Sequence, residues 1–126
     1  MNRRDFVFAG VTAAGTAACA LPVVHAGTRP VFAVIYDQRF SAAHAFADAM
    51  TWRGHSVFGY GGDLTAVWLH EIEPRWSRRA GALAGMTTPT ALFCLEQLAA
   101  QHWLRVVTRT DQRPGPGQML VSWVIA

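Results

Sequence analysis

The stretch from Leu83 to Leu95 constrains the fold of this chain more than any other. A short apolar run breaks at Gly85, a Thr-Thr-Pro sequence follows, and apolar residues then recur at helical spacing. This pattern is typical of a strand that leads into a buried helix. Thr88 is the expected N-cap and Pro89 the first helical residue, because the missing proline N–H would have no partner there. A further strand is expected over 104–110, so the unit reads strand, helix, strand.

The region before this unit predicts a second one. Residues 31–36 form a continuous apolar run, which indicates a central strand covered on both faces. A helix is expected from Ser41, as its N-cap, to a stop at Gly54, and a strand over 56–60 follows. Strand, helix and strand in this order predict a parallel pairing with a right-handed connection.

The remaining segments are less regular. Residues 64–73 fit either one face of a helix or a strand, and we expect a helix that Pro74 ends. An exposed connection is expected over 74–81. The Pro- and Gly-rich residues 111–117 predict a loop, and 119–125 a last strand that pairs antiparallel with 104–110. The predicted fold is an α/β layered domain whose sheet is mainly parallel with an antiparallel edge strand and helices packed on it.

Residues 1–26 have the layout of an export signal. Arg3 and Arg4 precede an uncharged run rich in alanine, glycine and threonine, and a small-residue cleavage pattern ends at Ala26. Arg3 and Arg4 with the following Phe6 resemble a twin-arginine translocation signal. That resemblance implies recognition by the twin-arginine translocase, export of the folded protein to the periplasm, and a cleaved product of residues 27–126 that forms one domain without a stable membrane anchor.

Three alternatives for this segment stay open. It fits an ordinary secretory signal that happens to carry two arginines. A membrane anchor fits less well, because an anchor needs about 20 strongly apolar residues and this run falls short of that. Cys19 follows a sequence that resembles a degenerate lipoprotein processing box, but Thr16 stands where that box has a large aliphatic residue. Cleavage after Ala26 leaves Cys94 as the only cysteine, so no disulfide can form within the exported domain.

Composition limits the chemistry of the domain. All eleven basic residues of the chain are arginines, so any charged contact to an anion is made by a guanidinium group. Without Arg3, Arg4 and Asp5, nine arginines stand against seven carboxylates. This near balance gives little support for nucleic-acid binding, and none is predicted.

The predicted sheet suggests where a ligand binds. Ligands of open parallel sheets bind beyond the carboxyl ends of the strands. Three strand-to-helix junctions are expected at that edge, and together they offer carboxylates, hydroxyls, one guanidinium and the free N–H groups of helix starts. The candidate ligand-binding residues are Asp37, Arg39, Ser41, Asp63, Thr87 and Thr88. In this hypothesis they line one shallow cleft for a small polar or anionic ligand, with Arg39 available to a carboxylate or phosphate.

Simpler roles compete with this hypothesis. Ser41, Asp63 and Thr88 are residue types that often only cap helices. Cys94 stands between apolar neighbours and is predicted to be an inert core thiol rather than a nucleophile. The four histidines beyond Ala26 have no metal-ligand spacing, and no glycine-rich phosphate motif occurs, so no metal or cofactor is predicted.

Two functions are consistent with these features. The first is a non-enzymatic accessory or binding module in the periplasm, serving a partner protein such as a redox enzyme, or a small ligand. Four tryptophans are suited to a partner surface, although some of them must be core: Trp52, Trp68, Trp76 and Trp103. The second is a small enzyme that uses Asp37 or Asp63 as a general base. We expect the first, because no nucleophile and base occur at a recognisable spacing.

Overall fold

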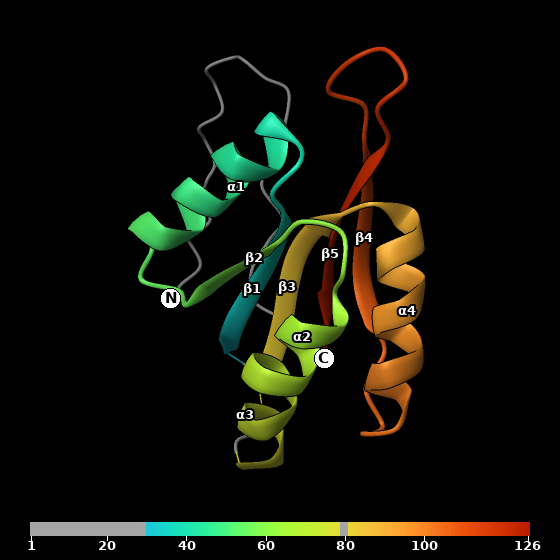
Figure 1. Ribbon diagram of the computed structural model, residues 1–126. Coiled ribbons are helices and arrows are strands. Elements are labelled where there is room, and N and C mark those ends of the chain that lie inside the picture. The colour runs from blue at the N-terminus through green and yellow to red at the C-terminus, as the bar shows by residue number, and fades with distance from the viewer. Residues whose placement is uncertain (1–29, 79–80) are drawn as a thin grey trace.

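A five-stranded sheet with the order β2-β1-β3-β5-β4 forms the centre of the structure, a computed structural model that describes residues 30–78 and 81–126 (Figure 1). The predicted signal segment, residues 1–26, lies outside the described residues. The strands are β1 (Val31–Asp37), β2 (Val57–Tyr60), β3 (Ala82–Thr87), β4 (Val106–Gln112) and β5 (Leu120–Ile125).

The sheet combines parallel and antiparallel pairings. β1 pairs parallel with β2 and with β3, whereas β5 pairs antiparallel with β3 and with β4. The prediction of an α/β domain is confirmed, and so is the antiparallel pairing of the last two strands. A mainly parallel sheet is not confirmed. The reason is that β5, not β4, is the neighbour of β3. β5 lies between β3 and β4 and pairs antiparallel with both.

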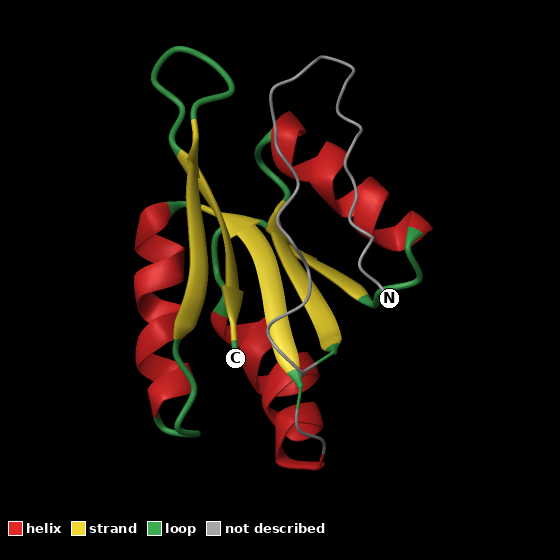
Figure 2. Cartoon of the chain, turned by 180° about the vertical axis from the view of Figure 1, so that it is seen from behind, coloured by secondary structure: helices red, strands yellow, loops and turns green. Residues whose placement is uncertain are grey.

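Helices cover the two faces of the sheet unequally. Helix α1 (Ser41–Trp52) lies on one face (Figure 2). The other face carries α4 (Pro89–Ala100) and a helical segment made of α2 (Thr65–Val67), the π-helical turn η3 (Trp68–Ile72) and α3 (Glu73–Arg78). Among the described residues, none of these helices is long and apolar enough to cross a membrane.

Strand β1 shows how the core divides between the faces. Its buried residues alternate, because successive side chains of a strand point to opposite sides. Val34 packs with Phe46 and Met50 of α1. Ala33 and Ile35 belong to the larger cluster on the other face, which contains residues of η3, α3 and α4. The continuous apolar run of the sequence therefore has the predicted cause, a central strand covered on both sides.

Gly85 does not end its strand, contrary to the sequence interpretation. β3 continues to Thr87, and a Cβ at Gly85 would lie only 2.6 Å from the Ile35 carbonyl oxygen and would overlap the Trp123 ring. Glycine is needed there because the Trp123 ring lies directly against the strand. Trp123 is fully buried, and its Nε1–H donates to the Thr87 hydroxyl at 3.0 Å, which links the end of β3 to the middle of β5.

The helix over 64–73 is confirmed, but its end is not at Pro74. The Glu73 N–H donates to the Trp68 carbonyl five residues earlier, and the wide turn lets the helix pass through Pro74 to Arg78. The predicted exposed connection over 74–81 is therefore wrong for its first part. Trp76 is 7% exposed, and its Nε1–H donates to the Gly81 carbonyl at 3.1 Å.

Two predicted helix ends have different outcomes. Gly54 does stop α1, with a φ of 88° that favours glycine. Ser41 does not cap the same helix. It is the first helical residue, and Phe40 occupies the N-cap position with no side-chain hydrogen bond. The Phe40 carbonyl instead accepts the Ala43 and His44 amides, both at 3.1 Å, so the helix starts without a polar cap.

Candidate functional site

The site lies where the chain changes direction across the sheet. From β1 the chain passes to β2 on one side, and it then crosses to β3 on the other side of β1. The carboxyl ends of β1 and β3 therefore form a topological switch point, the place where open α/β sheets bind ligands. Asp37 and Thr87 end these two strands, and Tyr60, which ends β2, is the register partner of Asp37.

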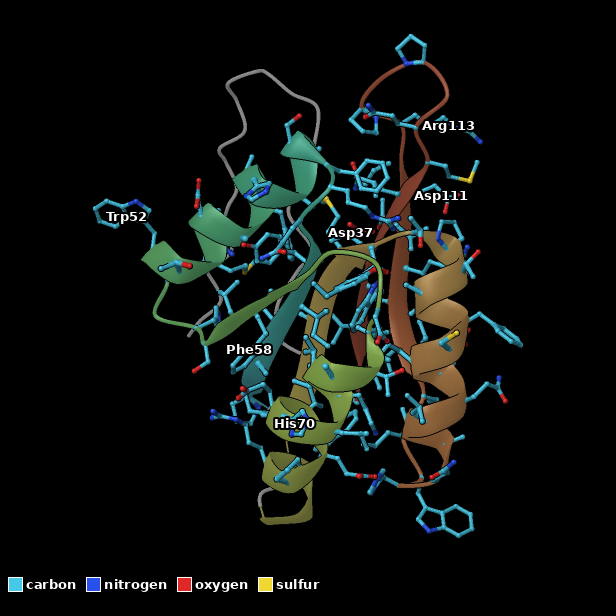
Figure 3. The ribbon with its side chains drawn as sticks, in the orientation of Figure 1. Asp37, Trp52, Phe58, His70, Asp111 and Arg113 are labelled. Atoms are coloured by element: carbon cyan, nitrogen blue, oxygen red, sulfur yellow. The ribbon has the colours of Figure 1, made fainter. Side chains whose placement is uncertain are left out.

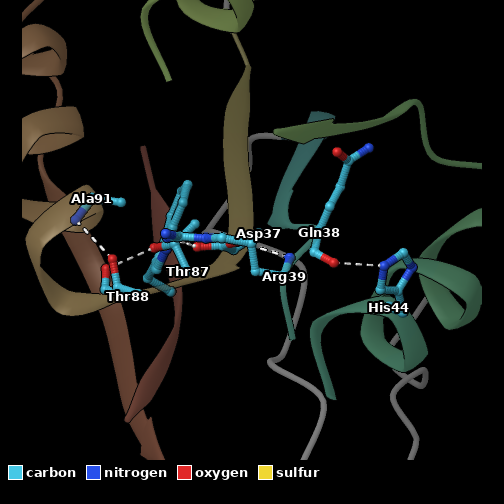
Figure 4. Close-up of polar contacts among 8 residues, drawn as sticks. Asp37, Gln38, Arg39, His44, Thr87, Thr88 and Ala91 are labelled. Atoms are coloured by element: carbon cyan, nitrogen blue, oxygen red, sulfur yellow. Dashed lines mark hydrogen bonds and ion pairs between the residues drawn. The ribbon is translucent and has the colours of Figure 1, made fainter. Parts of the chain in front are cut away.

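Asp37 and Arg39 form a closed ion pair at the end of β1 (Figure 4). Oδ1 of Asp37 accepts the Arg39 backbone N–H at 3.0 Å and the Nε–H at 2.9 Å, and Oδ2 accepts from Nη2 at 2.6 Å. Asp37 is fully buried, whereas the Arg39 side chain is 53% exposed. The carboxylate thus fixes the guanidinium from behind and leaves its outer edge toward solvent.

This pairing decides what each partner can do. Burial raises the pKa of Asp37, but the hydrogen bonds and charge of Arg39 outweigh burial and hold that pKa below its ordinary value. A carboxylate with a lowered pKa is a poor general base, so the geometry disfavours Asp37 as a catalytic base. Arg39 directs two of its five N–H groups at Asp37, and the other three remain for a ligand approaching its outer edge. We expected Arg39 to be an unpaired cation. Instead, Asp37 holds its guanidinium in one orientation.

Thr88 and Pro89 begin α4 as predicted. The Thr88 hydroxyl accepts the Ala91 N–H at 3.3 Å, and its carbonyl accepts the Leu92 N–H at 3.1 Å. Pro89 has no N–H, so the Thr90 amide is the donor of the first turn that the helix itself leaves unmatched. A twelve-residue helix thus presents one amide and the positive end of its dipole at the switch point.

Tyr60 supplies the most informative group of the site. The residue is 4% exposed, and its hydroxyl lies beside the Asp37 carboxylate and the Thr88 hydroxyl without a well-aligned hydrogen bond to any described residue. Burial and the negative charge of Asp37 raise its pKa, so the hydroxyl keeps its proton. A buried hydroxyl without a partner is costly, and native structures rarely keep one without a reason. Tyr60 is therefore a donor that an acceptor from outside the fold can engage in competition with the Asp37 carboxylate.

A groove of about 660 Å³ connects these groups. It runs between the α2–η3–α3 segment and α4, which form its two walls. The residues that line it are Arg39, Tyr60, Gly62, Asp63, Leu64, Thr65, Trp68, Leu69, Glu73, Thr88, Thr90, Ala91, Cys94, Leu98 and Gln101. Its volume is in the range of sites for small organic molecules.

The six predicted site residues divide into two groups. Arg39, Asp63 and Thr88 line the groove. Asp63 is exposed, and its Oδ1 accepts the Thr65 amide at 2.9 Å, so it also orders the start of α2.

The other three do not line the groove. Asp37 and Thr87 lie behind it as fully buried supports, Asp37 for Arg39 and Thr87 for the Trp123 indole. Ser41 is exposed on α1, which covers the opposite face of the sheet.

Sequence reasoning missed or misjudged several lining residues. Tyr60 directly precedes the Gly61–Asp63 junction, and its place at a strand end was the available signal. Cys94 was expected in the core but is exposed, because the buried face of α4 is formed by Leu92, Leu95 and Ala99. The prediction of a core position for this thiol is therefore wrong.

The tryptophans do not form one partner surface. Trp68 and Trp76 are buried and pack edge to face with ring centroids 5.4 Å apart. Trp52 is 91% exposed at the end of α1, where it projects away from the body of the domain (Figure 3). Trp103 is 95% exposed after α4. These two exposed rings lie at the ends of helices on opposite faces of the sheet, so they do not share a patch.

Metal binding finds no support in the described part of the chain, where no three His, Cys, Asp or Glu side chains lie close enough to hold an ion. Comparison with protein-family models, with curated proteins and with solved structures yields no match to this chain. The geometry of the groove is therefore what indicates a function.

Proposed function

We propose that this protein is exported through the twin-arginine route and acts in the periplasm as a non-enzymatic binding module for a small ligand with an acceptor-rich, anionic group. The observation that carries this proposal is the convergence of three donors on one groove. They are the outer edge of Arg39, the buried hydroxyl of Tyr60 and the Thr90 amide at the start of α4.

The chemistry of these donors favours binding over catalysis. Arg39 is held rigidly by Asp37, so little side-chain entropy remains to be lost when a ligand binds. Arg39, Tyr60 and the start of α4 offer hydrogen-bond donors, and the carboxylate behind them, Asp37, has a lowered pKa that makes it a poor general base. A module of this kind serves a periplasmic partner by carrying or sensing its ligand.

A thermal-shift screen of small acids tests this proposal on the wild-type chain, Arg39→Gln and Arg109→Gln. Arg109 is the matched control, because it also pairs with an aspartate two residues away, Asp111, at 3.7 Å, but on the exposed edge strand. We expect an acid that raises the melting temperature of the wild type and of Arg109→Gln but not of Arg39→Gln. Equal shifts in all three proteins, or no shift with any acid, would contradict the proposed site.

A further inference from the structure

The groove is long and changes character along its length. On α4 its lining runs from Thr90 to Gln101, which corresponds to about 16 Å at 1.5 Å per residue. The donors lie at the switch-point end. Beyond them the middle of the groove is apolar, with Trp68 and Leu69 on one side and Leu98 on the other, and Glu73 and Gln101 line its far end. A ligand that fills the groove therefore needs a polar head and an elongated apolar body.

The charges at the head favour an anion with a single negative charge over a dianion. Among the described residues that line the groove, Arg39 is the only cation, and Asp37 already neutralises it. Asp63 adds a carboxylate to the same end. The carboxylates repel a dianionic phosphate more strongly than a singly charged carboxylate, which the donors of Arg39, Tyr60 and the helix start can bind.

We infer that the groove binds an elongated monocarboxylate, with its carboxylate at Arg39 and Tyr60 and its apolar body between η3 and α4. This inference rests on the proposed function and narrows it to one class of ligand. The middle of the groove contains the Cys94 thiol, which is exposed without a ligand and becomes covered when the body of the acid lies over it.

The reactivity of the Cys94 thiol therefore reports whether a ligand occupies the groove. The full chain with Cys19→Ser has one thiol, and the rate of its alkylation by iodoacetamide is measured with acetate, hexanoate, decanoate, decanol and inorganic phosphate. We expect protection by decanoate at the lowest concentration, with an affinity gain of about fourfold for each methylene buried. Decanol lacks the carboxylate and is expected to protect at least tenfold less well.

Three variants locate the two ends of the ligand. Tyr60→Phe removes only the donor hydroxyl, and it is expected to weaken decanoate binding about tenfold. Leu69→Asp places a charge beside the apolar body at a half-exposed position that the fold tolerates, and it is expected to weaken decanoate far more than acetate. Val107→Asp, at a similarly exposed position on β4, is the control and should bind as the wild type does.

The outcomes separate this inference from the proposed function. Protection that is equal for acetate and decanoate, or tighter binding of phosphate, would overturn the elongated monocarboxylate while leaving an anion-binding groove. Decanol protecting as well as decanoate would also overturn it, because the head group would then contribute nothing. No protection by any probe, together with no shift in the thermal screen, would overturn both.

Discussion

Replacing Tyr60 by phenylalanine tests whether the buried hydroxyl of Tyr60 is unsatisfied in the protein without a ligand. The substitution preserves the ring, which packs in the core on the α4 side of the sheet, and removes only the oxygen. A buried donor without a partner costs about 1–3 kcal/mol relative to a satisfied one. We therefore expect Tyr60→Phe to raise the free energy of unfolding by about 1 kcal/mol, which corresponds to roughly 4–8 °C in melting temperature for a domain of this size.

Urea unfolding at neutral pH, followed by tryptophan fluorescence, measures this change. An unchanged dependence on urea concentration shows that the native and unfolded states are otherwise the same. Tyr36→Phe is the matched control, because Tyr36 is half-buried on the other face, against the edge of His44, and its loss should change stability little. A loss of about 1 kcal/mol or more in Tyr60→Phe would refute the reasoning, since the hydroxyl would then be bonded to Asp37 or Thr88.

The pH dependence provides a second readout of the same residue. Burial and the Asp37 charge raise the pKa of Tyr60, so its protonated form favours the folded state. This contribution is fully present below the unfolded value of about 10, and it is lost as the pH rises above that value toward the folded pKa. Wild-type protein should therefore lose stability above about pH 10 more steeply than Tyr60→Phe does. Parallel curves for the two proteins would contradict the buried environment assigned to the hydroxyl.

Three further predictions follow from other parts of the molecule. Because the folded pKa of Asp37 is lowered, its contribution is present above about pH 3.9 and is lost as the pH falls below that value; acid unfolding curves should show this loss in wild-type protein and not in Asp37→Asn. Gly85→Ala should destabilise the domain by about 3 kcal/mol in urea unfolding, because the added methyl group overlaps the Trp123 ring, and a change below about 0.5 kcal/mol would contradict that packing. Replacing Arg3 and Arg4 by lysine should retain folded protein in the cytoplasm, as cell fractionation measures, and normal periplasmic levels would disprove the twin-arginine proposal.

Local sequence rules predicted most of the elements but not the arrangement of the sheet. Thr88 and Pro89 predicted the start of α4 correctly, because cap and proline effects act within a few residues. The insertion of β5 between β3 and β4 depends on pairing between segments far apart in the sequence, which periodicity does not report. Gly85 was misread for the same reason, since the ring that requires a glycine there comes from Trp123.

The sequence predicted where the candidate site lies better than it predicted what each residue does there. The rule for strand ends placed Arg39, Asp63 and Thr88 at one edge, and all three line the groove. The rule does not distinguish a lining residue from a support, so Asp37 was expected to face a ligand although it is buried behind Arg39. Tyr60 escaped notice because an apolar pattern does not reveal whether a buried hydroxyl has a partner.

The groove at the switch point is proposed to bind an acid between Arg39 and the start of α4. Titration of the ¹⁵N-labelled full chain with decanoate, followed by proton–nitrogen correlation spectra, tests this most directly. We predict saturable shifts that are largest for the Arg39 side-chain Nε–H and for the amides of Thr90 and Ala91, and negligible for Trp52 at the far end of α1. Shifts that gather on α1, or spectra that do not change, would contradict the account.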